Sequence, residues 1–171
     1  MRDAIGIVPQ DAFLFSDTIS NNIRFGKENA TMEEIETAAK QAAVHDNIIQ
    51  FNQQYETVLG ERGITLSGGQ KQRVSIARAI IKDPKILLLD DCLSAVDTET
   101  EEKIINHLSS ISKNKTTLIV SHRVSTAKNA DQIILLDDGK IIQQGTHFQL
   151  VNQEGYYKAL YEKQLSEKEV E

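Results

Sequence analysis

Two kinds of hydrophobic pattern alternate along the chain and predict its elements. Short apolar runs predict buried strands over Ile5–Val8, Ile86–Leu89 and Thr116–Val120. Apolar residues at helical spacing predict helices over residues 18–23, 31–43, 46–51, 70–82, 98–111, 123–129, 146–152 and 156–164. Alternating runs around Asp138-Gly139 predict a β-hairpin. The charged end, 166–171, is expected to fray beyond the last helix.

The order of these elements indicates the fold class. From Thr18 to Lys82 the pattern is helical, and from Ile86 onward strands and helices alternate. Strand–helix alternation is typical of an α/β core built on a parallel sheet. The sequence therefore predicts an α/β protein whose core carries a helical insertion.

Composition and charge narrow the class of protein. The chain has 171 residues, 40% of them hydrophobic, which suits one domain with a sizeable core. The longest apolar runs, Ile86–Leu89 and Ile133–Leu136, are too short to cross a bilayer, and the N-terminus has no signal-peptide pattern. A net charge of −6 argues against a general nucleic-acid surface. The single cysteine, Cys92, excludes an internal disulfide and is interpreted as a small core residue.

A glycine-containing turn gives the chain its first candidate site. Ser67-Gly68-Gly69-Gln70 stands where a helix is predicted to begin. Exposed N–H groups and the positive end of a helix favour an anion such as phosphate. A Ser-Gly-Gly triplet by itself is more often an ordinary loop, so this interpretation needs support from elsewhere in the chain.

Paired acids supply that support. The apolar run Ile86–Leu89 ends in Asp90 and Asp91, so a buried strand would deliver two carboxylates at its C-terminal tip. A hard divalent cation such as Mg²⁺ takes oxygen ligands of this kind. A lone strand-end Asp more often caps the following turn, and it is the combination with the glycine turn that favours a site.

Together, the Leu66–Gln70 and Ile86–Asp91 motifs resemble the ATP-binding cassette (ABC) ATPase family. The resemblance implies an incomplete P-loop NTPase core with a helical subdomain. It implies a helical subdomain at 17–82, carrying the signature turn, and a core made of 1–16 and 83–171.

One family motif is missing from this sequence. No Gly-x-x-x-x-Gly-Lys-Ser/Thr occurs in it, although that loop normally holds the β- and γ-phosphates. In the family the loop lies upstream of the position matching Gln10. The start of the chain is therefore expected to be a truncation inside a domain. The family's phosphate-loop strand lies between strands matching 116–121 and 132–136, so we expect its loss to leave a strand edge and one apolar face uncovered.

The resemblance assigns roles to residues that serve the chain's own nucleotide. Asp90 would hold Mg²⁺, and Gln10 resembles the Q-loop glutamine, a ligand of Mg²⁺ and water. Asp91 stands at the position of the catalytic base, and His122 matches the switch histidine that contacts the γ-phosphate. His45, His107 and His147 lack such context.

Other residues are expected to serve a partner. Ser67, Gly68, Gly69 and Gln70 would contact the ATP of a second cassette in a head-to-tail dimer. Ser94 to Asp97 resembles the D-loop, which meets that partner. Gly60-Glu61-Arg62-Gly63 resembles the exporter segment that touches the coupling helices of a transmembrane domain.

Asp91 departs from the family pattern, which usually has Glu at this position. Asp is one methylene shorter, so its oxygens retreat by about 1.5 Å, and a misplacement of order 1 Å can cost about 10²-fold in rate. The site containing Asp91 is therefore expected to be slow, unless a small backbone shift restores its reach.

The resulting hypothesis is one half of an ABC exporter at the cytoplasmic face of a membrane, with ATP and Mg²⁺ as cofactors. The altered base favours a heterodimer, and a homodimer stays open. Two alternatives stay open from the sequence: a truncated, non-catalytic binding module, and an ABC ATPase that works without a membrane. The transported substrate does not follow from these residues.

Overall fold

The computed structural model describes residues 4–60, 65–111 and 115–168. It divides into two compact units, Met1–Val120 and Ser121–Glu171, and each is described by itself. Most of the predicted site residues belong to the first unit, whereas His122 belongs to the second. The predicted division into a helical subdomain and a core stays a prediction.

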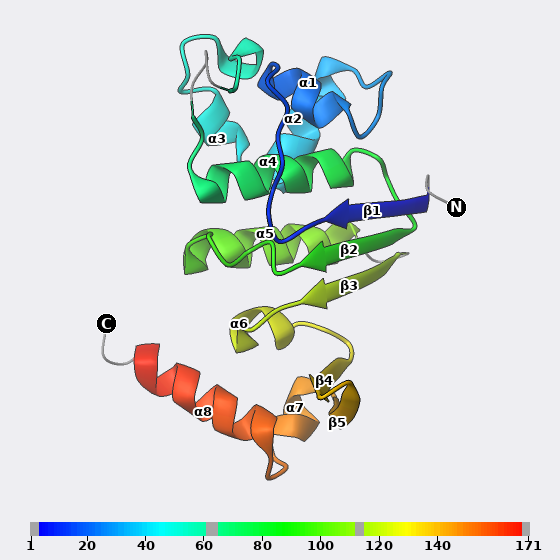
Figure 1. Ribbon diagram of the computed structural model, residues 1–171, viewed down its shortest axis with the longest axis vertical. Coiled ribbons are helices and arrows are strands. Elements are labelled where there is room, and N and C mark those ends of the chain that lie inside the picture. The colour runs from blue at the N-terminus through cyan, green and yellow to red at the C-terminus, as the bar shows by residue number, and fades with distance from the viewer. Residues whose placement is uncertain (1–3, 61–64, 112–114, 169–171) are drawn as a thin grey trace. The chain divides into compact units, whose positions relative to one another are not determined.

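A three-stranded parallel sheet organises the first unit. Its strands are β1 (Ile5–Val8), β2 (Ile86–Asp90) and β3 (Thr116–Val120), in the order β1-β2-β3. Val8 pairs with Leu89, and Asp90 pairs with Val120. The three strands point the same way in Figure 1, so their carboxyl ends lie at one edge of the sheet. The strand predictions and the α/β class are confirmed.

Helices, several of them with side-chain caps, make up most of the rest of this unit. They are α1 (Ile19–Arg24), α2 (Met32–Gln41), α3 (His45–Ile48), the 3₁₀ turn η2 (Gln54–Glu56), α4 (Gly68–Ile80) and α5 (Thr98–Ile111). Thr18 caps α1, and Thr31 forms a capping box with Glu34 at the start of α2. At the far end of α4, Asp83 has a φ of +51° and precedes Pro84, which together stop the helix.

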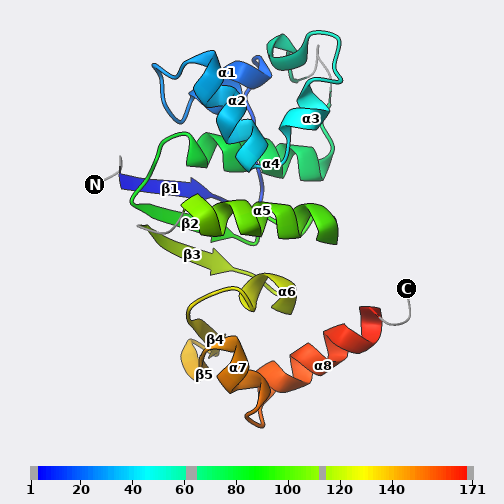
Figure 2. The same ribbon diagram turned by 180° about the vertical axis from the view of Figure 1, so that it is seen from behind.

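The two faces of the sheet differ in burial. Val8, Leu87 and Leu89 are buried in one core with apolar residues of α4 and α5. Helix α5 lies behind the sheet in Figure 1 and in front of it in Figure 2, so it covers this face. Because strand side chains alternate, the neighbouring residues point to the opposite face.

That opposite face is apolar and exposed. Ile7 and Leu118 are each 57% exposed, Val120 is 46% exposed and Ile86 is 41% exposed. Among the described residues, β3 pairs with β2 alone. Both observations agree with the expectation of an uncovered face beside an open strand edge. A contiguous apolar patch of this kind favours association.

Arg78 of α4 ties the connector after β1 to the helices. Its guanidinium donates to Phe13 O and to both Asn22 O and Asn22 Oδ1, each at 2.8 Å. It also lies over the rings of Phe15 and Phe25. Burial lowers the pKa of this guanidinium below its ordinary value. One half-buried cation thus fixes the path of the connector.

The second unit joins a hairpin to three helices. Its elements are α6 (Val124–Ala127), β4 (Ile133–Asp137), β5 (Lys140–Gly145), α7 (His147–Val151) and α8 (Tyr156–Lys168). Strands β4 and β5 are antiparallel, and Asp138 and Gly139 both have positive φ in the turn between them. The hairpin prediction is confirmed. A small core of Val124, Ile133, Leu150 and Tyr157 holds the unit together.

Several element boundaries differ from the prediction by one or more residues, and three of them are described here. Helix α2 ends at Gln41, since Ala43 adopts a φ of +52° that breaks the helix. Helix α3 ends at Ile48 rather than at residue 51. Helix α8 continues to Lys168, so the charged end is helical three residues into the segment expected to fray. For α2 the apolar periodicity predicted the helix, and the backbone angle of Ala43 decided its end.

No helix in the described part of the chain is both long and apolar enough to span a membrane.

The exposed sheet face leads to a prediction about association. We expect the 171-residue chain to self-associate, because Ile7 and Leu118 present apolar surface beside an open strand edge. Replacing both by Lys should shift the chain towards monomer, since a buried charge disfavours face-to-face contact. Sedimentation velocity across a concentration series measures the change.

Phe148→Lys is the matched control, because Phe148 is 77% exposed and lies outside this sheet. It should leave association unchanged. A wild-type chain that stays monomeric at high concentration would contradict the prediction.

Candidate active site

The signature turn opens a helix, as the sequence predicted. Ser67 is the N-cap of α4: its hydroxyl accepts the Gln70 N–H at 3.2 Å, and Gln70 Oε1 accepts the Ser67 N–H at 3.0 Å. The first intrahelical bond runs from Lys71 N to Ser67 O. Gly68 and Gly69 precede that bond, so their N–H groups have no partner within the helix. Ser67 and Gly68 are exposed, which leaves this positive helix end open to an anion.

Gly69 is required by its contact with the turn after β2. A Cβ on Gly69 would lie 2.7 Å from Ala95 O, closer than real Cβ atoms come to backbone. Gly68 is less restricted, since its nearest neighbour would be the Ala95 methyl group at 3.7 Å. The start of α4 therefore packs directly on the 94–97 turn of the same chain.

Two further residues of α4 strengthen this contact, and the sequence analysis did not identify them. Gln72 is buried, and its Oε1 accepts the Ala95 N–H at 3.2 Å. Arg73 donates to Gly69 O at 3.2 Å and to Ala43 O. No sequence signal pointed to Gln72, because the packing of α4 decides that this glutamine is buried, and a buried amide then needs a hydrogen-bond partner.

Asp97 ends the turn and begins α5. Its Oδ1 accepts the Thr100 N–H at 2.9 Å, and this bond is the main cause that lowers the pKa of Asp97. The charge of Arg73 lowers the same pKa further. Ser94 donates its hydroxyl to Asp91 O at 2.9 Å. The 94–97 turn is thus held by α4 on one side and by Asp91 on the other.

The paired acids lie at the carboxyl edge of the sheet. Asp90 is the last residue of β2 and is exposed, whereas Asp91 is half-buried. Asp91 donates its N–H to Val120 O at 2.9 Å and has a φ of +43°. That left-handed geometry is uncommon for a residue with a side chain, and Asp tolerates it better than most. The chain bends sharply at Asp91 as it leaves the strand.

Gln10 lies two residues beyond the end of β1, the strand next to β2. Its side chain is exposed, as is that of Asp90. A carboxylate and an amide oxygen at neighbouring strand ends suit Mg²⁺, which takes one or two protein ligands together with phosphate oxygens. The donor chemistry therefore fits a metal that arrives with a nucleotide.

Cys92 behaves as a core residue. It is 2% exposed, and burial raises the pKa of its thiol to about 12, with the charges of Asp91 and Asp90 adding to the effect. The thiol is therefore protonated at neutral pH, as the core interpretation requires.

His122 belongs to the second unit. It is exposed and follows the last residue of β3 by two positions. The other histidines have structural partners: His45 Nδ1 bonds Tyr55 OH, His147 Nδ1 bonds Tyr157 OH, and His107 Nδ1 bonds Gln41 O. The structure brings the signature turn and the 94–97 turn together, and it places Gln10 and Asp90 at adjacent strand ends.

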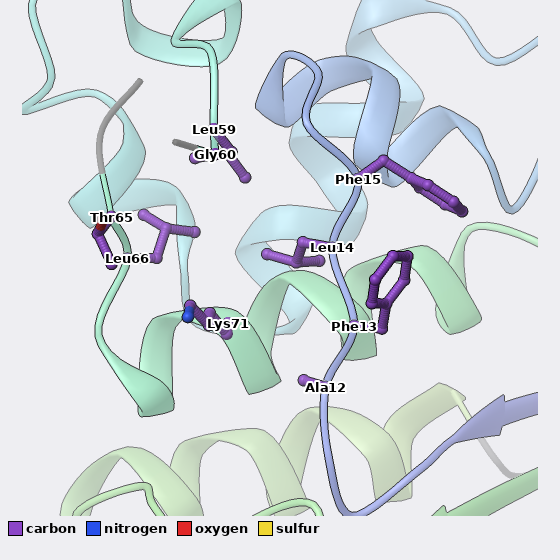
Figure 3. A pocket seen from close by; sticks show the side chains of 9 residues that line it. All are labelled: Ala12, Phe13, Leu14, Phe15, Leu59, Gly60, Thr65, Leu66 and Lys71. Carbon is purple, nitrogen blue, oxygen red and sulfur yellow. The ribbon is translucent and has the colours of Figure 1, made fainter. Parts of the chain in front are cut away.

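A separate pocket of about 270 Å³ lies beside the first turn of α4. Figure 3 shows Leu14 of the connector pointing towards Leu59 and Leu66, with Lys71 below them. Gly60 and Thr65 also line the pocket. They flank residues 61–64, which lie outside the described residues together with most of the predicted Gly60–Gly63 contact segment.

The backbone at Asp91 leads to a stability prediction. Asp91→Gly and Asp91→Ala both remove the carboxylate, but only Gly adopts a φ of +43° without steric cost. We expect the Gly variant to be more stable than the Ala variant by about 1 kcal/mol. Urea denaturation of the two variants measures the difference.

Asp46 in α3 provides the control, since Gly is less stable than Ala inside a helix by about 1 kcal/mol. The ranking of the two variants should reverse there. Equal stability of the Gly and Ala variants at position 91 would mean that this backbone carries no strain.

Comparison with known proteins places the chain in a family. A family model described as ABC transporter matches residues 1–94. The chain is 50% identical over 166 residues to ATP-binding cassette sub-family B member 6 of Xenopus tropicalis, and 52% identical over 165 residues to the uncharacterized ABC transporter ATP-binding protein YfiB of Bacillus subtilis. These matches cover 97% and 96% of this chain, but 20% and 28% of the relatives.

A solved structure agrees with these matches. A bacterial Atm1-family ABC exporter with ATP bound superposes with a TM-score of 0.90 at 45% identity, over 95% of this chain and 29% of that one. The chain thus spans between a fifth and a third of the length of these proteins. With a family model matching more than half of its residues, the chain belongs to the ABC transporter family.

Proposed function

We propose that this chain is part of the ATP-binding and ATP-hydrolysing unit of an ABC exporter, which couples ATP to transport of a substrate across a membrane. One observation carries the proposal. The exposed glycine turn that opens α4 packs on the turn that follows Asp90 and Asp91. An anion-binding helix end and a pair of strand-end carboxylates are thus built into one rigid piece of the chain.

Each acidic or polar side chain has a distinct task in this proposal. Asp90 and Gln10 hold Mg²⁺, which supplies charge neutralisation on the phosphates when it is bound. Asp91 accepts a hydrogen bond from the attacking water and orients it. His122 contacts the terminal phosphate through its ring.

The signature turn serves a partner rather than the chain's own nucleotide. Ser67 and Gly68 are exposed, and Ser94 and Ala95 beside them are exposed too. Two neighbouring exposed turns form one surface that suits a second cassette, arranged head to tail. The relatives' membership of the ABC family supports dimerisation in general, and a heterodimer is our finer proposal.

The pocket beside α4 is suited to bind a segment of the transmembrane domain of an exporter. Its lining is largely apolar, with Leu14, Leu59 and Leu66, and Lys71 adds one positive charge. Gly60, which lines it, is the first residue of the Gly60–Gly63 segment, which resembles the part of exporters that touches coupling helices. We propose that a short amphipathic segment of the transmembrane domain docks there, on the cytoplasmic side of the membrane.

A pair of substitutions in the complete protein tests the proposed asymmetry. Ser67→Arg places a bulky cation where the partner's phosphate must lie, so we expect most Mg²⁺-dependent ATP hydrolysis to be lost. Asp91→Asn removes a base that is one methylene short, so much of the hydrolysis should survive. Steady-state ATPase assays of both variants give the ranking.

Ser110→Arg and Asp46→Asn are the matched controls, because both positions are exposed and distant in sequence from the site. They should retain wild-type turnover. If Asp91→Asn abolishes hydrolysis as fully as Ser67→Arg, Asp91 is a working base and two equivalent sites are favoured. If neither variant affects hydrolysis, the proposed function is wrong.

The 171-residue chain by itself should hydrolyse ATP negligibly. Its sequence contains no Gly-x-x-x-x-Gly-Lys-Ser/Thr, so the groups that hold the β- and γ-phosphates are missing from it. A phosphate-release assay of the purified chain checks this. Mg²⁺-dependent turnover that disappears on His122→Ala would overturn the prediction.

A further inference from the structure

One side chain of α8 binds the backbone on both sides of residue 123. Gln164 Nε2 donates to His122 O at 3.0 Å, and Gln164 Oε1 accepts the Val124 N–H at 2.9 Å. A carboxamide has both a donor and an acceptor, so it makes the two bonds at once. The segment that carries His122 is therefore held at two points by a residue 42 positions away.

The packing of α8 against the core fixes the position of the backbone that carries the Gln164 side chain. Tyr157 is 2% exposed in the core of the unit, and Leu160 and Tyr161 pack against that core. Residues 157, 160, 161 and 164 follow helical spacing and share one face of α8. Tyr157 OH also bonds His147 Nδ1 at 2.8 Å. Gln164 therefore extends from the anchored face of the helix.

One of the two bonds has a simple structural purpose. Helix α6 has only four residues, and its N-cap, Arg123, makes no side-chain cap bond. Gln164 Oε1 supplies that cap through the Val124 N–H. Capping needs an acceptor only, so the second bond, to His122 O, requires a different explanation.

We propose that Gln164 is a positioning residue for His122. By holding the His122 carbonyl and the Val124 N–H together, it restricts the backbone rotations that would swing the imidazole away from its target. This inference rests on the proposed ATPase function, in which His122 contacts the terminal phosphate. A displacement of order 1 Å at such a group can cost up to about 10²-fold in rate.

Two substitutions separate positioning from capping in the complete exporter. Gln164→Met keeps the size of the side chain but removes both bonds. Gln164→Glu keeps the acceptor for Val124 N–H and favours a helix N-terminus, but it sets an oxygen against His122 O. We measure kcat in a Ser67→Arg background, in which the proposal leaves turnover only at the slower site that contains Asp91 and His122. There we expect kcat for MgATP to fall about tenfold in both variants with KM unchanged, because nucleotide binding does not depend on this bond.

A backbone measurement adds a readout besides activity. Hydrogen exchange at the Val124 amide should be faster in Gln164→Met and close to wild type in Gln164→Glu, which keeps the cap. Gln153→Met is the control, since Gln153 is an exposed glutamine in the turn after α7. It should change neither exchange nor kcat.

The outcomes distinguish this inference from the function on which it rests. A kcat in Gln164→Glu equal to that of its Ser67→Arg parent would show that Gln164 is a cap alone, and unchanged Val124 exchange in Gln164→Met would show that the clamp does not form; either result overturns the inference. If the hydrolysis that remains in the Ser67→Arg background does not require His122, as tested by His122→Ala in that background, the inference and the role of His122 in the proposed function fail together. If Gln164→Met does not fold, Gln164→Glu still decides, because it retains the cap.

Discussion

Parallel pairing of β2 with strands on both sides is the constraint from which the arrangement of the first unit follows. The register of β2 against β1 and β3 brings the carboxyl ends of the three strands to one edge of the sheet. Asp90 ends β2 at this edge, and the segment that leads to Gln10 leaves β1 there. Main-chain hydrogen bonds continue one step past the strand, from Asp91 N to Val120 O. The turn that leads into α5 therefore starts from a defined point, and the start of α4 can pack against it.

The contact between α4 and the 94–97 turn joins two segments whose hydrogen bond, between Gln72 and Ala95, spans 23 positions of the sequence. Gly69 permits the close approach, and Gln72 and Arg73 add hydrogen bonds around it. Asp97 belongs to the same turn, and its carboxylate caps α5. Since side chains and backbone interlock here, a shift of the signature turn would be transmitted to the turn after the paired acids.

Burial across the sheet is strongly unequal. Val8 and Leu89 are fully buried against the helices, whereas Ile7 and Leu118 on the opposite face are more than half exposed. The same alternation of side chains produces both faces, so the exposed apolar residues are a direct consequence of the strand pattern. Such a face is a site of association whenever it is left in contact with water.

The sequence by itself determined the element types, the α/β class and the family. Strong signals were responsible: apolar runs for strands, helical spacing for α2, α4 and α5, and the Ser67–Gln70 and Asp90–Asp91 motifs. The helix end at Gln41 did not follow, because it depends on a single backbone angle, that of Ala43. The roles of Gln72 and Gln164 did not follow either, since an isolated glutamine carries no pattern. Only the tertiary structure decided their partners, because hydrogen bonds from Gln72 to Ala95 and from Gln164 to His122 join residues that chain folding, not sequence proximity, brings together.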